Sequence, residues 1–502
     1  MPAPAPKKKK TAVRIRCYRQ GLGDCFLLTF TTGKTKKSHV LIDCGVWPKG
    51  PVHTAKMREI VTDIIKETGG SFDAAGQPKT RGTIDVLVGT HEHWDHLSGF
   101  HQARDLFTKG LTVRHVWLAW TEGDDDLAKE LRKEKKKKEK AVREIHARLA
   151  GMPRPQLSLA GQAALQQLDS VLGFLGVDGA KAGTIDEAMD FVTSGFPGAK
   201  TECLFPGAVP DVPGAAGVRA FVLGPPHDRA KIRKSTPSKA HREVYELFFG
   251  LSLEDSLLAA LGAHDDEQAR FRDPDEIGRP FDRTHRLKID EVRKAAGTEL
   301  GAFLRDHYDA EDWRRIDHDW LFAGGSLALR LDSATNNTSL VLAFELPDKR
   351  VLLFPGDAQV GNWLSWHDPH DWKDAQGRAV SVTARDLLER TVFYKVGHHG
   401  SHNATLRELG LELMGDPGLI AVVPVSHQMA LANKWDKIPL QSLVDRLREQ
   451  TRGRLWFTVE YQKGKKNFTN PDIATLTQLK PAERTALKKS VAVDPLWLDF
   501  TL

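Results

Sequence analysis

A dense group of histidine and aspartate side chains directly follows a short apolar run, and this combination constrains the fold more than any other feature. The run spans residues 84–89 and ends in glycine, which predicts a buried strand that opens into a loop. The loop carries His91, His93, Asp95 and His96. Because side chains alternate along an extended chain, His91 and His93 can converge on one point while Asp95 and His96, where the chain turns, face a second.

These four side chains are of the kinds that bind metals. Imidazole nitrogens and carboxylates suit zinc, manganese or iron. Such a group within residues 91–96 is hard to explain by packing alone, so we predict a metal site at the end of this strand. A solvated, histidine-rich surface loop is the competing interpretation.

A second apolar run, residues 351–354, is followed by Pro355, Gly356 and Asp357. The Pro-Gly pair predicts a sharp turn that presents Asp357 at the end of a buried strand. A carboxylate can bridge two cations at once, which predicts that Asp357 is a bridging ligand. The alternative is that Asp357 caps the turn or the next helix.

A third apolar run, residues 392–396, precedes the adjacent pair His398 and His399. At least one of these two histidines should be a metal ligand. A ligand imidazole needs its other nitrogen held by a neighbour, so the second histidine of the pair can have a supporting role.

The His-x-His-x-Asp-His pattern after a strand resembles the signature of the metallo-β-lactamase fold. Five further segments agree with it in order, namely residues 20–28, 41–45, 336–342, 352–358 and 395–401. This series is similar to the hydrolase domain of the bacterial DNA-uptake competence channel and to the related phosphorylcholine esterases. The resemblance covers residues 12–100 and 320–460. It implies an α/β (αββα) sandwich of two mixed β-sheets with outer helices.

The resemblance also implies two divalent cations, Zn²⁺ or Mn²⁺, held by six side chains. These ligands are His91, His93, Asp95, His96, Asp357 and His399. Hydroxide held by the cations would attack an ester phosphorus, with Asp95 orienting or deprotonating it. Lys395 or His398 would stabilise the departing oxygen, and His398 could instead support His399 or donate a proton. Expected near the substrate are Asn337, Ser401, His402 and His427.

The sequence departs from the family pattern at two places. Where many members supply another histidine before the bridging aspartate, this chain has Asn336 and Asn337. Where close relatives have Gly-His-Pro after the last core strand, residues 433–439 contain no histidine, and His427 is the nearest candidate. We therefore expect one of the two metal sites to be weak, exchangeable, or better filled by manganese than by zinc.

The length and hydrophobic content allow one large core with an insertion. The chain has 502 residues, of which 40% are hydrophobic. We expect a disordered basic tail over residues 1–10, the first half of the fold over 11–225, a mostly helical insertion or lid over 226–318, and the second half over 319–502.

Aromatic side chains are concentrated just after the predicted bridging aspartate. Trp363, Trp366 and Trp372 lie there, together with two histidines. Packing against the fold is one interpretation of this cluster. The other is a wall of the active site that stacks on a nucleobase.

The net charge of +6 is concentrated in Lys7–Lys10 and in residues 129–140, so the rest of the chain is nearly neutral. The second basic segment predicts a solvated helix, with attraction of a polyanion as the alternative. The four cysteines lack zinc-ribbon spacing and are typical of reduced core residues. With no long apolar segment, we expect a cytoplasmic protein that does not cross a membrane.

Three functional hypotheses follow. The first is a metal-dependent phosphodiesterase or nuclease acting on single-stranded nucleic acid or a cyclic nucleotide, which depends largely on the resemblance. The second is a hydrolase of a carboxylic ester, thioester or lactam, which would use the same metals. The third is a non-catalytic regulatory module of a bacterial defence system, in which the incomplete ligand set forms only a binding pocket.

Overall fold

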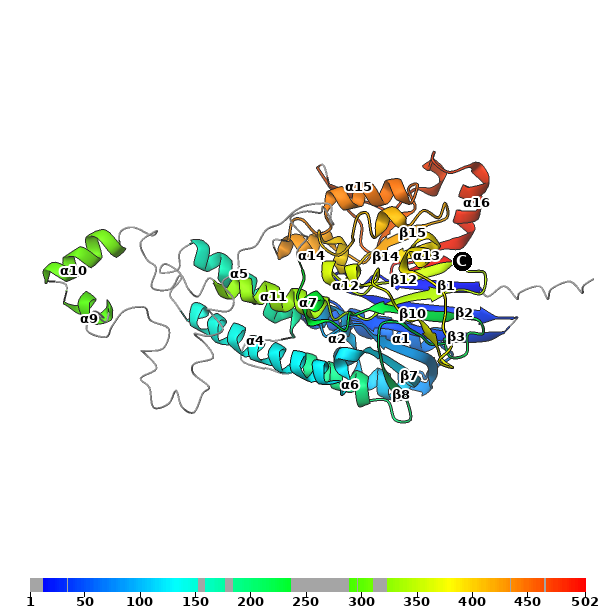
Figure 1. Cartoon of the computed structure of the whole chain (residues 1–502), viewed down its shortest axis with the longest axis horizontal. Helices are drawn as coiled ribbons and strands as arrows, with labels where there is room; N and C mark the ends of the chain where they lie inside the picture. The colour runs from blue at the N-terminus through cyan, green and yellow to red at the C-terminus, as the bar shows by residue number, and fades with distance from the viewer. Residues whose placement is uncertain are drawn as a thin grey trace, which may run out of the picture. The chain divides into compact units, whose positions relative to one another are not determined.

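The computed structural model describes most of the chain (Figure 1). The described ranges are residues 12–33, 35–151, 159–176, 184–235, 289–295, 297–309, 323–433, 435–464 and 466–502. Contacts divide the chain into two units. Unit 1 comprises Met1–Arg132, Gly173–Phe248 and Ser333–Leu502, and unit 2 comprises Lys133–Leu172 and Phe249–Asp332.

Unit 1 contains an eight-stranded mixed sheet, visible in Figure 1 with most of its strands in blue. Its strands, in spatial order, are β19 (Val491–Val493), β20 (Trp497–Thr501), β1 (Ala12–Tyr18), β2 (Cys25–Thr32), β3 (Lys36–Cys44), β6 (Gly82–Gly89), β7 (Leu111–Ala119) and β8 (Lys200–Leu204). Pairing is antiparallel from β19 to β3 and parallel from β3 to β8.

A six-stranded mixed sheet forms the other half of unit 1. Its strands, in spatial order, are β10 (Arg219–Gly224), β11 (Val341–Glu345), β12 (Val351–Phe354), β14 (Thr391–Lys395), β15 (Ile420–Val423) and β16 (Leu455–Phe457). Pairing is antiparallel from β10 to β12 and parallel from β12 to β16. The run Val351–Phe354 is buried at every position, as expected for a strand covered on both faces.

The two sheets pack face to face through alternate side chains of their strands. Phe26, Leu28 and Phe30 of β2 belong to one buried cluster that also contains side chains of the second sheet. The ring of Phe26 lies 5.5 Å from that of Phe354, and the ring of Phe30 lies 6.1 Å from that of Phe344, measured between centroids. The period of two along β2 therefore turns one set of residues toward the facing sheet and leaves the other set for the outer helices.

Helices and short turns cover the outer faces of the sheets. Those of unit 1 are α1 (Pro51–Glu67), α2 (Trp94–Gln102), α3 (Arg104–Gly110), α6 (Thr184–Ser194), α7 (Arg229–Ile232), α12 (Val360–Ser365), α13 (Ala384–Glu389), α14 (His427–Ala432), α15 (Gln441–Gln450) and α16 (Pro481–Ser490). Met57, Ile60 and Ile64 of α1 share a buried cluster with Leu27 and Leu41, the residues of β2 and β3 that point away from the facing sheet. The predicted sandwich of two mixed sheets with outer helices is confirmed.

Three small two-stranded sheets and several further helices complete the described chain. The small sheets pair β4 (Ser71–Phe72) with β5 (Pro78–Thr80), β9 (Ala208–Val209) with β13 (Lys373–Asp374), and β17 (Tyr461–Lys463) with β18 (Lys466–Phe468). The helices with residues in both units are α4 (Asp126–Ala150), α5 (Leu159–Phe174) and α11 (Ala323–Asn336). Within unit 2 lie α9 (Ile289–Lys294), α10 (Glu299–Phe303) and a π-helical turn, Leu304–Asp309.

The basic helix predicted around residues 129–140 is found as α4. Its charged stretch has internal ion pairs such as Lys138 with Glu134, at 3.0 Å. Val142, Ile145 and Leu149 are nevertheless fully buried, so α4 has one apolar face and is not solvated on all sides.

The predicted domain boundaries remain predictions. The expected tail over residues 1–10 lies outside the described residues, as does most of the expected insertion over 226–318. Within the described ranges, no helix combines the length and the apolar composition needed to cross a lipid bilayer.

Candidate metal centre

The six predicted ligands converge at one edge of the sandwich and are all buried, with exposed fractions of 2% or less. They are His91, His93, Asp95, His96, Asp357 and His399. The first four occupy the loop after β6 and the first turn of α2, and the other two follow β12 and β14. In each sheet the carboxyl ends of parallel strands share one edge, which brings segments distant in sequence together.

His91 and His93 point a nitrogen at each other. Nε2 of His91 lies 3.1 Å from Nδ1 of His93. Two nitrogens that each bind one zinc ion at about 2.0–2.1 Å in tetrahedral geometry are roughly 3.3 Å apart. The observed separation fits two ligands of a common cation.

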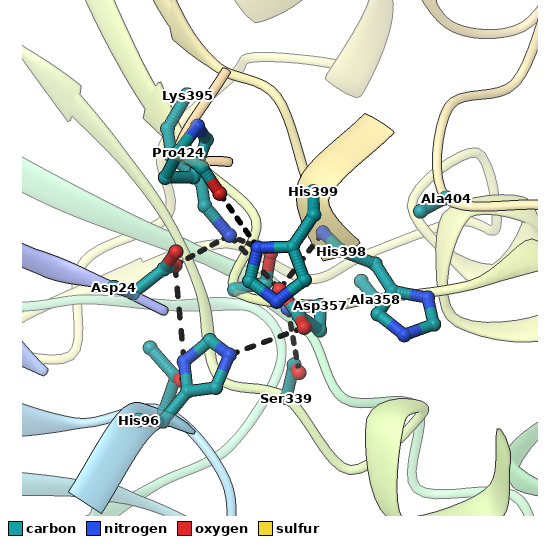
Figure 2. Close-up of polar contacts among 12 residues, drawn as sticks. Asp24, His96, Ser339, Asp357, Ala358, Lys395, His398, His399, Ala404 and Pro424 are labelled. Atoms are coloured by element: carbon teal, nitrogen blue, oxygen red, sulfur yellow. Dashed lines mark hydrogen bonds and ion pairs between the residues drawn. The ribbon is translucent and has the colours of Figure 1, made fainter. Parts of the chain in front are cut away.

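Asp357 is shared by two groups of potential ligands, and Figure 2 shows its contact with His96 of the first group. One group is His91, His96 and Asp357, and the other is Asp95, Asp357 and His399, with the ligand atoms of each group within 4.8 Å of one another. Oδ2 of Asp357 lies 3.1 Å from Nε2 of His96. Nε2 of His399 lies 2.8 Å from Oδ2 of Asp95. Asp357 is therefore common to both groups, and its expected role as a bridging ligand stays a prediction.

Hydrogen bonds fix the tautomers of the histidine rings. Nδ1 of His399 donates to the carbonyl oxygen of Pro424 at 2.6 Å, and Nδ1 of His96 donates to Oδ2 of Asp43 at 2.8 Å. The Thr90 hydroxyl donates to the same carboxylate at 2.7 Å, so its oxygen accepts from Nδ1 of His91 at 3.1 Å. In the neutral form, all three rings therefore present an unprotonated Nε2, as metal ligands do.

Two buried acceptors in the cluster lack a protein donor. Among the described residues, Oδ1 of Asp95 and Oδ1 of Asp24 have no hydrogen-bond partner. A buried carboxylate oxygen without a donor is costly, and a cation at this place would satisfy it. Together with the ring tautomers and the separation between His91 and His93, this shows that the donor set fits divalent cations.

Asp24 and Asp43 are part of the cluster, although no local sequence pattern marked them as site residues. Asp24 directly precedes β2, and Asp43 lies at the end of β3, the antiparallel neighbour in which Cys44 pairs with Cys25. With His96 they form a third group whose ligand atoms lie within 4.8 Å of one another. Both aspartates lie at strand ends within segments that carried the family resemblance, which is the signal that could have identified them.

Lys395 connects the carboxylates of the site. Its Nζ donates to the carbonyl oxygen of Gly356 at 2.6 Å and to Oδ1 of Asp357 at 2.9 Å, and it lies 2.5 Å from Oδ2 of Asp24. An ammonium group has three N–H donors, and these three acceptors use all of them. The contacts therefore favour a role in positioning Asp24 and Asp357 over the predicted contact with a departing oxygen.

The loop after β14 holds its two histidines in an unusual backbone conformation. His398 and His399 have φ values of 43° and 54°, in the left-handed region that residues other than glycine rarely adopt. The backbone N–H of His398 donates to Oδ1 of Asp357 at 2.8 Å. This conformation turns His399 toward Asp95, while Nδ1 of His398 lies 2.8 Å from the hydroxyl of Ser401. The roles expected for His398 and Ser401 stay predictions.

The charges of the cluster are strongly coupled. Burial raises the pKa of Asp24 to about 6, although Lys395 and His96 oppose the shift. Burial alone would also raise the pKa of Asp357, but Lys395 and His96 outweigh it and hold this pKa well below its usual value. Burial lowers the pKa of His398 to about 4, so this ring is neutral at pH 7.

Among the histidines, His91 and His96 shift in opposite directions. Burial, together with the neighbouring histidines, holds the pKa of His91 well below its usual value. Burial alone would lower the pKa of His96, but the carboxylates around it, Asp357 first among them, raise it well above the usual value. The contrast reflects the position of His96 among four aspartates.

The other expected substrate contacts have different surroundings. The side chain of Asn337 donates to the carbonyl oxygens of Ile232 and Lys234 and accepts from the backbone of Gln359, which gives it a structural role. His427 is buried, with Nδ1 2.5 Å from the carbonyl oxygen of Ile438, and belongs to none of the potential metal groups of the described residues. His402 follows Ser401 in the same loop, and its part in substrate binding stays a prediction.

Comparison with known families bears on the first part of this site. Residues 18–181 match the metallo-beta-lactamase superfamily. The metallo-beta-lactamase match includes the loop with His91 and Asp95 and ends before Asp357, which the fold itself brings to the same place. This superfamily consists mostly of metal-dependent hydrolases, which supports an enzyme of that general kind. A comparison with curated proteins gives no match.

Proposed function

We propose that the protein is a metal-dependent hydrolase of phosphodiester bonds, a nuclease or a phosphodiesterase of small nucleotides. The observation that carries this proposal is the position of Asp357 between two groups of ligands. These residues would hold up to two divalent cations, which would supply the Lewis acidity and charge neutralisation that hydrolysis of a phosphodiester requires. The similarity of the later segments to the competence-channel hydrolase domain also supports the proposal.

The residues divide naturally between two cations. His91, His93 and His96 would contribute to one cation. Asp95 and His399 would contribute to the other, and Asp357 is common to both groups. Divalent cations at such a site supply Lewis acidity and lower the pKa of a coordinated water.

The surrounding residues orient the reactants and control protons. Asp95 would contribute one carboxylate oxygen to the cation that it shares with His399, and its other oxygen would orient a water or accept its proton. Because His398 is neutral at pH 7, it offers a substrate oxygen a hydrogen bond and not a formal positive charge. Lys395 keeps Asp24 and Asp357 ionised and fixed in place.

The test compares ester classes and variants. We expect the purified protein with Mn²⁺ or Zn²⁺ to hydrolyse bis-p-nitrophenyl phosphate and to degrade single-stranded DNA or RNA. Asp95→Asn and Asp357→Asn should lower the rate by about 10²-fold or more, as loss of electrostatic stabilisation does elsewhere. The exposed Asp348, which pairs with Arg350, provides the matched control Asp348→Asn.

The alternative functions give different results. Hydrolysis of p-nitrophenyl acetate or a lactam that depends on Asp357, without attack on any phosphodiester, would establish the ester or lactam hydrolase. Absence of bound metal by elemental analysis, together with absence of turnover, would contradict an enzymatic role and favour the regulatory module.

A further inference from the structure

Three aromatic rings stack directly beside the candidate metal centre. The ring of Phe174 lies 5.0 Å from that of Trp47 and 5.1 Å from that of Trp435, with interplanar angles of 23° and 16°. Phe174 also lies 5.8 Å from the ring of His93, a predicted ligand. Phe174 therefore connects the aromatic stack of Trp47, Phe174 and Trp435 to the predicted metal ligand His93.

The stack differs from the aromatic packing in the core. Trp363 and Trp366, which the sequence offered as a possible base-stacking wall, are fully buried and stack on each other at 3.8 Å. Phe174 and Trp435 are only half-buried. Trp47 follows β3, Phe174 is the last residue of α5, and Trp435 follows α14. The three rings therefore lie at or just beyond the ends of regular elements, where binding residues commonly lie.

The packing of the stack depends on a glycine. A Cβ at Gly173 would lie 1.8 Å from Cη2 of Trp47, so only glycine lets the end of α5 approach this ring. Among the described residues, Nε1 of Trp47 is buried without a hydrogen-bond partner, which is costly unless a water or a ligand oxygen accepts from it. The glycine permits the close packing of the rings, and the indole N–H of Trp47 is a buried donor that a ligand could use.

A positive charge lies close to the stack. Lys49, two residues after Trp47, places its Nζ 4.4 Å from the centre of the Trp94 ring and donates to the carbonyl oxygen of Gly176. Trp94 stands between His93 and Asp95 in the sequence. An aromatic surface, a cation and a candidate metal centre thus occur side by side, which is the combination that recognises a base next to a phosphate.

We infer that the aromatic stack is a base-binding subsite, in which Phe174 and Trp435 stack on the nucleobase adjoining the phosphate held at the metal centre. The inference rests on the proposed function, because it assigns the substrate class of the same site. It selects nucleotide-bearing phosphodiesters over alkyl phosphodiesters such as glycerophosphodiesters. Stacking on a base is worth about 1–3 kcal/mol, equivalent to roughly 5- to 150-fold in affinity.

Binding measurements test the subsite without requiring turnover. Isothermal titration in the presence of Mn²⁺ compares thymidine 5′-monophosphate with 2-deoxyribose 5-phosphate, which carries the same phosphate and sugar without the base. We expect the full-length protein to bind the nucleotide roughly 5- to 150-fold more tightly. In Phe174→Ala and Trp435→Ala this ratio should fall toward one, with the affinity for the sugar phosphate changed by less than about twofold.

Two variants separate stacking from a structural role. Phe174→Tyr keeps a ring face and should keep the preference for the nucleotide. Phe205→Leu removes another half-exposed ring, stacked on Trp120 at 6.0 Å, and should leave the preference unchanged. A ratio near one in the unaltered protein would overturn the inference, as would equal losses for both ligands in Phe174→Ala and Trp435→Ala.

The two proposals can fail separately. A protein that prefers the nucleotide but cleaves no phosphodiester would retain the base-binding subsite and contradict the proposed reaction. A protein that cleaves bis-p-nitrophenyl phosphate but binds both probes equally would retain the reaction and contradict the subsite.

Discussion

The ammonium group of Lys395 lies 2.9 Å from Oδ1 of Asp357, and both side chains are almost completely buried. The substitution Lys395→Met removes this ammonium group and leaves the carboxylates of Asp24 and Asp357 buried without its positive charge. We expect a loss of about 3–5 kcal/mol in the free energy of unfolding, as for other broken buried pairs, measured by urea denaturation in the presence of a chelator.

Added metal should reduce that loss, because a bound cation supplies the missing positive charge. The control is Lys349→Met, which removes an exposed lysine from its pair with Glu345 and should cost less than about 1 kcal/mol. Equal losses in the two variants would show that Lys395 is not the central charge of the site.

Asp43 should control metal affinity without contacting substrate. Its carboxylate accepts from Nδ1 of His96 at 2.8 Å and from the backbone N–H of Thr90 at 2.9 Å. Asp43→Asn should weaken Mn²⁺ or Zn²⁺ binding by about 10- to 100-fold, as loss of an orienting carboxylate does at other metal sites. Isothermal titration with the metal alone measures this.

A matched control exists on a neighbouring strand. Asp85 is also buried and accepts from a backbone N–H, that of His39, at 2.9 Å, but it lies outside the potential metal groups of the described residues. Asp85→Asn should leave metal affinity unchanged within about twofold even if it lowers stability. Parallel loss of metal affinity in both variants would indicate a general effect of unfolding.

Gly45 should tolerate no side chain, because an added Cβ would lie 2.3 Å from the backbone carbonyl carbon of Asp95. Gly45→Ala would push the first turn of α2 away from Asp24, whose backbone N–H donates to Asp95 at 3.0 Å. We expect a loss of about 1–3 kcal/mol in unfolding free energy, together with weaker metal binding. Gly415→Ala, at a position with no atom within 4 Å of the added Cβ, should have neither effect.

Glu345 should make stability depend on pH in the acid range. Burial would raise its pKa, but hydrogen bonds from Arg219, Lys349 and Arg390 outweigh burial and lower the pKa below its usual value of 4.5. A carboxyl with a depressed pKa stabilises the folded state above its unfolded-state pKa, and this contribution is lost as pH falls through the folded value. Below about pH 4.5 the stability of the wild type should therefore fall more steeply than that of Glu345→Gln.

Urea denaturation of the wild type and of Glu345→Gln at each pH gives the contribution of Glu345 as the difference between them. The buried carboxylates of the metal centre are present in both proteins and cancel. Glu130→Gln, which removes the exposed carboxylate that pairs with Arg229, is the control. Its stability should depend on pH in the same way as that of the wild type. Parallel curves for wild type and Glu345→Gln would contradict the prediction.

Local sequence patterns predicted the parts of the site that depend on one strand and its loop. His91, His93, Asp95 and His96 could be recognised because a single apolar run and the turn after it fix their relation. The same reasoning placed Asp357 and His399 at strand ends, and the contacts between Asp95 and His399 follow from the facing sheets.

Contributions that depend on the register of neighbouring strands could not be predicted in this way. Asp43 reaches His96 because β3 lies beside β6, and Asp24 reaches Lys395 because β2 begins where β3 ends. The aromatic side chains show the same limit. Sequence proximity to Asp357 drew attention to Trp363, whereas the rings beside the centre come from three distant segments.

The ligands of the metal centre are divided between the two sheets. His91 to His96 follow β6 of the larger sheet, whereas Asp357 and His399 follow strands of the smaller one. A cation bound there would link the two sheets, so its binding energy would oppose their separation during unfolding. During synthesis the ligands that follow β6 leave the ribosome long before Asp357 and His399 do. The nascent chain would therefore bind metal tightly only after the segment with His399 has folded against the strands made first.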